Sequence, residues 1–267
     1  MIIFATDSTA NTMQNTDRIS AVILVKNAEK TIAECLESLS TFNEIVLLDN
    51  GCTDDTVAIA TKFPNVKVFS EPNFCGFGTM KNIAVSYASN DWILSIDSDE
   101  VLMPEIVGKI NAMQLNDNTV VALSRLNYYG DRCMKCCGWY PDYVWRIFNR
   151  KYTRFNENIV HEGVEILPDT EKISIKDAIK HYAADSIESI IQKMNRYTTL
   201  SAQEKHAQGK KASVTGAIFR FIHTFNMNYF FRKGIFYGYR GFVVSVLNAS
   251  GAYYRYMKLY ELNKKSK

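Results

Sequence analysis

The first hundred residues alternate short apolar runs with segments of helical periodicity, and this alternation restricts the fold more than any other feature of the chain. Between the first two runs, Ile32, Cys35 and Leu39 fall at i, i+3 and i+7, which places them on one face of a helix. Four runs have the length of buried strands: residues 19–25, 44–49, 66–69 and 92–96. Strands that alternate with helices in this way are typical of a parallel sheet with crossover helices.

Acidic residues follow the fourth of these runs directly, as Asp97-Ser98-Asp99-Glu100. Ligands of open α/β sheets bind at the carboxyl ends of the strands, where these side chains are expected. Carboxylates suit Mg²⁺ or Mn²⁺, which commonly takes one or two of them and fills its shell with substrate phosphates. A solvated turn or a helix cap is the alternative for an acidic pair at a strand end.

The middle of the chain predicts a helix over residues 104–113, with Thr53 as the N-cap of an earlier short helix, and further strands at 120–126 and 144–148. Between these strands, Cys133, Cys136 and Cys137 form a motif that would fit half of a zinc site. No second Cys or His pair with matching spacing follows, so we interpret it as a loop. Six cysteines without a signal peptide indicate free thiols in a reducing compartment.

The C-terminal quarter differs from the rest in charge. Residues 205–267 hold twelve Lys and Arg against one acid, Glu261, whereas the preceding residues carry about −8. Fourteen of the thirty Phe and Tyr lie in residues 219–260. The longest stretch without charge, 241–254, is 14 residues, too short for the ~20 of a spanning helix. We therefore expect a peripheral, interfacial segment on an anionic membrane; a helical subdomain with a basic outer face and an oligomer interface are alternatives. No recognition module points to nucleic acid.

Four segments in order, residues 22–29, 46–56, 78–82 and 92–100, resemble the family 2 glycosyltransferases. The resemblance implies an α/β GT-A fold, with a Rossmann-like mixed sheet, followed here by a helical, basic and aromatic-rich extension. We accordingly expect a flexible leader at residues 1–18, a GT-A catalytic domain at 19–185 and a helical membrane-associating region at 186–267.

The same resemblance implies roles for individual residues. Asp49, after the second strand, would bind the uracil, and Lys81 would lie near the uridine diphosphate. Asp97 would face the ribose or donor sugar, and Asp97 and Asp99 would hold the divalent cation. A turn-capping Asp is the alternative for Asp49, and a solvated helix residue is the alternative for Lys81.

Segments further along resemble the lipopolysaccharide core glucosyltransferases of Gram-negative bacteria: residues 138–142, 146–150, 160–162, 181–182 and 193–197. This implies an inverting enzyme, cytoplasmic and peripheral on the inner membrane, that transfers a hexose, in that subgroup glucose, from a UDP-sugar to inner-core heptose or a related glycolipid. The alternatives are another surface-polysaccharide transferase, a sugar-nucleotide pyrophosphorylase and an inactive membrane-bound scaffold. A pyrophosphorylase would need a Gly-rich, Arg-containing loop after the first strand, which residues 26–29 do not supply.

Transfer also needs a base to take the proton of the acceptor hydroxyl. Glu162 is the first candidate because it falls on the acceptor side of the family pattern, and Asp142 is the second. His161 and His181 would either complete the metal shell or be packed side chains. For Arg146 and Arg150, binding of an acceptor phosphate and a solvated strand face are both open.

Overall fold

A nine-stranded mixed sheet forms the centre of the protein in the computed structural model, which describes residues 14–157 and 162–265. The order is β3-β2-β1-β4-β8-β6-β9-β5, with β7 paired to β6. The strands are β1 (Ile19–Val25), β2 (Glu44–Asp49), β3 (Val66–Ser70), β4 (Trp92–Ser95), β5 (Glu100–Leu102), β6 (Thr119–Tyr129), β7 (Arg132–Cys133), β8 (Tyr143–Asn149) and β9 (Glu171–Ala184). β1 to β4 are parallel, as expected, and β8 is antiparallel to both β4 and β6.

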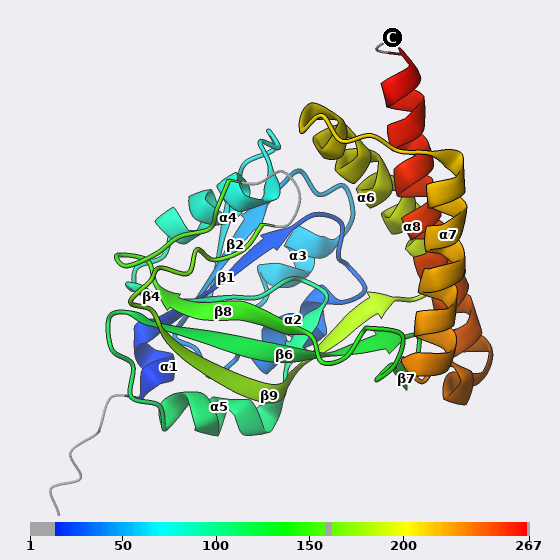
Figure 1. Cartoon of the computed structure of the whole chain (residues 1–267). Helices are drawn as coiled ribbons and strands as arrows, with labels where there is room; N and C mark the ends of the chain where they lie inside the picture. Colours follow the sequence, from blue (N-terminus) through cyan, green and yellow to red (C-terminus); the bar gives the residue numbers. More distant parts are fainter. Residues whose placement is uncertain (1–13, 158–161, 266–267) are drawn as a thin grey trace, which may run out of the picture.

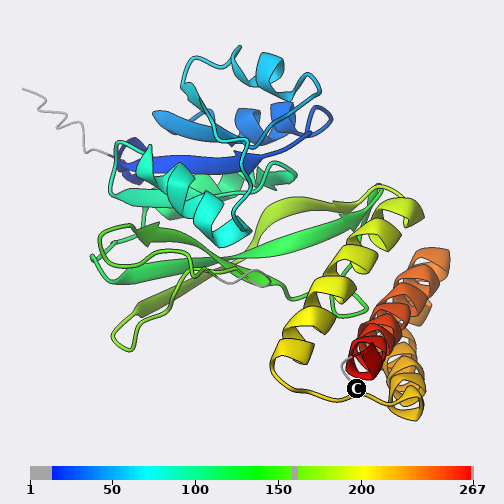
Figure 2. The ribbon, with the colours of Figure 1, turned by 90° about the horizontal axis from the view of Figure 1, so that it is seen from above.

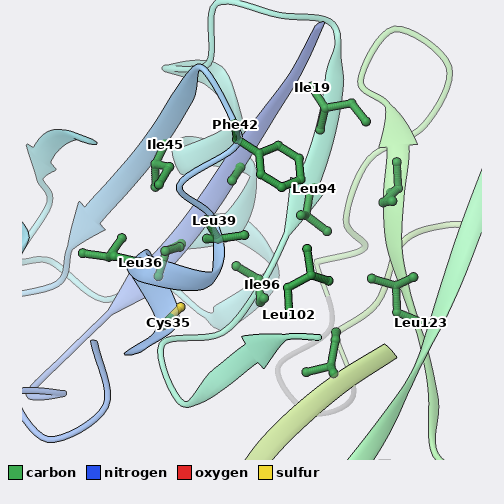
Figure 3. Close-up of a cluster of buried hydrophobic side chains, with 14 of the residues drawn as sticks. Ile19, Cys35, Leu36, Leu39, Phe42, Ile45, Leu94, Ile96, Leu102 and Leu123 are labelled. Carbon is green, nitrogen blue, oxygen red and sulfur yellow. The ribbon is translucent and has the colours of Figure 1, made fainter. Parts of the chain in front are cut away.

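Helices cover both faces of this sheet (Figure 1). Those of the first half are α1 (Asn15–Arg18), α2 (Ile32–Ser38), α3 (Thr56–Ala60), α4 (Phe77–Ser86) and α5 (Pro104–Asn111). On one face, Leu36 of α2 and Phe42 pack against Leu94 of β4, within a cluster that α5 extends (Figure 3). On the other face, Met80 and Ala84 of α4 pack against β1, β2 and β4. The periodic apolar residues therefore bury the faces that the sequence predicts.

The remaining helices stand together beside the sheet (Figure 2). They are α6 (Ile187–Ala207), α7 (Val214–Asn226), the π-helix η1 (Met227–Phe231), the 3₁₀ helix η2 (Gly234–Tyr237) and α8 (Gly238–Lys265). Ser186 caps α6 by accepting a hydrogen bond from the Ser189 N–H. Close packing at the start of α8 requires glycine, because a Cβ on Gly241 would lie 1.9 Å from the Gly234 carbonyl oxygen.

The cysteine motif lies where the helices meet the sheet. Cys136 and Cys137 are buried against Val244 of α8, and the Asn248 side chain donates to the Cys137 carbonyl at 3.1 Å. All six thiols are free. The motif therefore joins the sheet to α8 through packing.

Several elements differ from expectation. The 14-residue strand β9 and the short β5 and β7 were not predicted, although Ile173 and Ile175 alternate with polar residues as in a half-buried strand. Thr53 as N-cap is wrong, since α3 begins at Thr56 after Asp55. The last part of the expected leader is helix α1, in which the Asn15 amide donates to two carbonyls at the end of α5. Residues 1–13 and His161 lie outside the described residues.

Candidate active site

Two cations hold Asp97 in place just beyond the carboxyl end of β4. Lys81 of α4 lies 3.0 Å from Asp97 Oδ1, and Arg146 of β8 lies 2.7 Å from Asp97 Oδ2. Lys81 and Arg146 are both buried, so neither cation is mainly solvated. Burial by itself would raise the pKa of Asp97, but the charges and hydrogen bonds of Arg146 and Lys81 outweigh it and hold this pKa well below its ordinary value. Asp97 is therefore ionised at neutral pH.

Glu100 is the buried acid beneath this pair. Its Oε1 accepts from Arg146 Nη2 at 2.5 Å and from Arg125 Nη1 at 3.2 Å, while its Oε2 accepts from the Asp97 N–H at 2.9 Å. Glu100 is fully buried and Arg146 is 2% exposed. Buried charges persist where they are paired and hydrogen-bonded in this way. Arg146 thus holds Asp97 and Glu100 in place from within the buried part of the site.

Both expectations for Arg146 are wrong, because this side chain is neither on a solvated strand face nor free for an acceptor phosphate. Arg150 is likewise engaged: it donates to the carbonyls of Val85 and Ala88 at 3.2 and 2.7 Å and pairs with Asp91 at 3.4 Å. Arg150 therefore connects the end of β8 to the end of α4.

Asp99 and Asp142 belong to one chain of polar contacts. The Asn127 amide nitrogen donates to Asp142 Oδ2 and to the Trp139 carbonyl, both at 2.8 Å. The amide oxygen of Asn127 thus faces His181 Nδ1, at 2.5 Å, and this nitrogen must be the donor. His181 Nε2 then lies 3.6 Å from Asp99 Oδ2. In a neutral His181, Nε2 would carry a lone pair next to the carboxylate.

Glu162 lies on the Lys81 side of the site, with its Oε1 3.7 Å from Lys81 Nζ. Phe155 and Asn156 are held close to α4. A Cβ on Gly78 would lie 1.9 Å from the Asn156 carbonyl oxygen, and the Asn82 side chain bonds the backbone of Phe155 in both directions, at 2.9 and 3.0 Å. Glu162 and Asp97 therefore lie beside the same lysine.

Asp142 lies immediately before β8 and pairs with Arg125, whose Nη2 is 2.8 Å from Asp142 Oδ2. Arg125 also contacts Glu100, so both candidate bases belong to one network of ion pairs. Asp142 joins this network directly, through Arg125. Glu162 joins it through Lys81 and Asp97. The structure therefore brings together five of the six residues expected from sequence, namely Lys81, Asp97, Asp99, Asp142 and Glu162.

Asp49 is the sixth. It lies at the same edge of the sheet as these five, but within the part of the chain that the structure describes it contacts none of them. Asp49 is the last residue of β2. Because β2, β1 and β4 are parallel, Asp49 and Asp97 lie at the same edge of the sheet. Asp49 Oδ1 accepts from the Cys52 N–H at 2.7 Å. Asp49 thus caps the turn, as the alternative predicts. Binding of uracil by Asp49 stays a prediction.

A ready-made metal cage is not present: among the described residues, no group of three or more His, Cys, Asp or Glu side chains is arranged to hold an ion. Both oxygens of Asp97 already contact cations. Asp99 and His181 offer one oxygen and one nitrogen to a shared space, and catalytic ions complete their shell with substrate. The donor set therefore fits a divalent cation that arrives with a diphosphate.

Sequence reasoning gave no role to Glu100, Arg125 or Asn127. Arg125 and Asn127 lie two residues apart on β6 and so face the same side of the sheet. An arginine and an asparagine on the same face of a largely apolar strand were the available signal. Their partners could not be inferred, because these come from β5, β8 and β9.

Comparison with known proteins identifies the family of this chain. The model of glycosyl transferase family 2 matches residues 20–160. This chain belongs to that family. An uncharacterized glycosyltransferase of Rickettsia typhi is 32% identical over 263 residues, which cover 94% of this chain and 89% of the relative. The lipopolysaccharide core biosynthesis glycosyltransferase LpsC of Rhizobium meliloti is 26% identical over 257 residues, covering 91% and 92%.

Among solved structures, residues 1–349 of S. aureus TarS in complex with UDP-GlcNAc match with a TM-score of 0.46 and 15% identity, over 94% of this chain and 92% of that one. The assignment rests on the family model and the sequence relatives. The mixed sheet with its helical C-terminal region is thus the GT-A fold of a family 2 glycosyltransferase, as the sequence predicts.

Proposed function

We propose that this family 2 glycosyltransferase transfers a hexose, in the first instance glucose, from a UDP-sugar to an inner-core lipopolysaccharide heptose or a related glycolipid, with inversion. The observation that carries the proposal is that Lys81, Asp97 and Asp99 lie together at the carboxyl edge of the parallel strands. Similarity to LpsC, a lipopolysaccharide core biosynthesis glycosyltransferase, supports a core-lipopolysaccharide acceptor. A transferase for another surface polysaccharide stays the alternative.

On this proposal Lys81 and Asp97 face the donor, and Lys81 offsets the charge of its diphosphate. Asp97, held by two cations, keeps a fixed orientation for a hydroxyl of the ribose or sugar. Asp99 would hold the divalent cation, with His181 as a second ligand oriented by Asn127. When bound, such an ion neutralises charge that develops on the departing diphosphate. Of the two acids expected at the metal, Asp99 is the better direct ligand because Asp97 is already paired.

The base is Glu162 or Asp142, and each is placed by a cation. A carboxylate fixed in this way can accept the proton of an acceptor hydroxyl without rearrangement. Glu162 remains the first choice because it is next to the lysine assigned to the donor.

Peripheral membrane binding forms part of the proposal. No helix within residues 14–157 and 162–265 has both the length and the hydropathy to cross a bilayer. Phe219 of α7, Phe231 of η1 and Phe236 of η2 are 69, 75 and 74% exposed, and the exposed Arg220 and Lys233 lie beside them in sequence. Exposed aromatic rings with neighbouring basic residues favour insertion into an anionic interface. We call these three rings and the exposed Ile218, Ile222 and Phe230 the aromatic surface.

Purified protein with Mn²⁺ should be incubated with a panel of UDP-sugars, and UDP release measured with and without truncated core lipopolysaccharide. We expect one UDP-hexose to give acceptor-dependent release. If none of the UDP-sugars gives UDP release, the donor assignment is wrong. If UDP release is the same with and without core lipopolysaccharide, the acceptor assignment is wrong. Family membership already argues against a pyrophosphorylase, and the intact cluster of charges argues against an inactive scaffold.

A further inference from the structure

A cavity of about 390 Å³ lies between α6 and α8, beside the end of β9. This volume falls within the range of small-molecule sites, about 300–1,000 Å³. Gly251 lets α8 approach α6 closely here, since a Cβ at this position would lie 3.3 Å from Met194 Cγ. The lining residues are Trp139, Ala183, Ile190, Lys193, Met194 and Tyr197, with Thr198, Leu247, Asn248, Gly251 and Arg255.

The charges of this cavity are one-sided. Lys193 and Arg255 line it, and no Asp or Glu does. Arg255 Nε is buried without a hydrogen-bond partner, and Arg255 forms no ion pair with any residue that the structure describes. A buried Nε–H without an acceptor is costly, and an anion in the cavity would supply the missing acceptor.

The cavity lies beside the candidate active site. Lys193 Nζ donates to the Ala183 carbonyl at 3.0 Å and lies 4.0 Å from Asp99 Oδ2. Tyr197 lines the cavity as well; burial raises the pKa of its hydroxyl, and the nearby charges of Glu162, Asp97 and Asp99 raise it further. A ligand in this space would therefore lie next to the acids assigned to transfer.

We propose that this cavity binds an anionic group, a phosphate or a carboxylate, carried by the acceptor saccharide. The proposal rests on the proposed function and specifies its acceptor as a charged sugar. Arg255 and Lys193 contact the anion, and the flat sides of Trp139 and Tyr197 pack against the apolar face of a sugar ring. Arg255 is thus a specificity-determining residue of the acceptor site.

Ligand-observed NMR on the full chain, saturated with UDP, can test this with four probes: mannose 6-phosphate, mannuronate, mannose and inorganic phosphate. We expect one or both anionic sugars to bind more tightly than mannose and than phosphate alone. Preference between the phosphorylated and the carboxylated sugar tells the two sources of charge apart. Equal binding of charged and neutral sugars, or none at millimolar concentration, would overturn the proposal.

Three variants localise the effect. Arg255→Gln should weaken binding of the preferred anionic sugar roughly tenfold or more, the loss of a charge-assisted hydrogen bond, whereas Arg255→Lys should weaken it less. Lys264→Gln removes a charge from the exposed end of the same helix and should have no effect. Equal effects of Arg255→Gln and Lys264→Gln would overturn the site. Binding of UDP by the same samples is the separate test of the proposed function: if it persists while the anionic sugars fail, only the cavity proposal is lost.

Discussion

Arg146 Nη2 lies 2.7 Å from Asp97 Oδ2, although Arg146 belongs to β8 and Asp97 follows β4. The antiparallel pairing of β4 with β8 brings them together, and Glu100 completes the group from below. The acid expected to face the donor sugar is therefore fixed by a cation that has almost no contact with solvent.

Arg146→Met should destabilise the fold, because it leaves the buried Glu100 without its closest cation and removes one of the two cations of Asp97. Breaking a buried ion pair from one side costs about 3–5 kcal/mol. Arg146→Lys keeps the charge, but one ammonium cannot replace the guanidinium fork, so we expect a smaller loss of stability and still a clear loss of transfer. Urea unfolding and UDP release measure the two effects. If Arg146→Met has the same free energy of unfolding as the wild type, the ion pair contributes nothing to the stability of the fold.

The far end of β2 contains a second buried acid, with consequences for pH. Glu44 accepts from Lys67 Nζ at 2.7 Å, from the N–H and hydroxyl of Ser89 at 2.8 and 2.7 Å, and from the Ser20 hydroxyl. Burial alone would raise its pKa, but these donors lower the pKa from 4.5 to about 2. Since the folded pKa is the lower one, the stabilisation is complete above the unfolded pKa and is lost as pH falls from 4.5 toward 2.

Glu44→Gln should therefore reduce the free energy of unfolding at pH 7, by roughly 2 kcal/mol. The difference from wild type should shrink between pH 5 and about 2, as the wild-type carboxyl becomes protonated. Urea unfolding at a series of pH values measures this. A difference that stays constant over that interval would mean that folding does not shift the pKa of Glu44.

The parallel half of the sheet could be predicted from sequence because each strand and helix there has its own local periodicity, as at Ile32, Cys35 and Leu39. Lys81, Asp97 and Asp99 could be named because they lie in motifs of a known family. β9 was missed because Asp177, Ala178 and His181 interrupt its alternation. Its pairing with β6 and β5 is a tertiary property.

The contacts that complete the site could not be predicted for a related reason. Arg125, Arg146 and His181 each meet an acid more than fifteen residues away, and no local pattern reports such a partner. The aromatic surface of α7, η1 and η2 was predicted only as a composition. Its three most exposed rings became identifiable once burial was known for each residue.

Asp99→Asn should nearly abolish transfer while leaving the fold intact, because it removes the charge of the assigned metal ligand without changing its size. EDTA should have the same effect on the wild type, and Mn²⁺ should restore activity only there. His181→Gln should weaken Mn²⁺ binding without preventing UDP binding in metal-free buffer. Calorimetry measures both affinities. Full turnover of folded Asp99→Asn in metal-free buffer would rule out the metal role.

The aromatic surface should hold the protein to anionic vesicles at low salt, with binding that weakens as salt rises. Replacing Phe219, Phe231 and Phe236 together with Ser should weaken binding at least about 100-fold, since each ring contributes about 1.5–3 kcal/mol when buried. Tyr87→Ser is the control, because Tyr87 is 42% exposed but stacks on Phe69 in the sheet domain. Liposome flotation measures the effect. If wild type does not float with anionic vesicles, the surface serves packing or oligomerisation instead.

The choice of base can be decided with two isosteric variants. Glu162→Gln removes the acid next to Lys81, and Asp142→Asn removes the acid held by Arg125 and Asn127. The true base should lose about 10²–10⁴ in transfer rate while its variant still binds the UDP-sugar, because proton abstraction contributes to the rate and not to donor affinity. Single-turnover transfer and calorimetric donor binding separate the two quantities. We expect Glu162→Gln to show this split. If Asp142→Asn shows it and Glu162→Gln keeps near-normal turnover, the base is Asp142, and Glu162 instead helps Asp97 to orient Lys81 toward the diphosphate. If neither variant slows transfer, the proton is taken by a group outside this network.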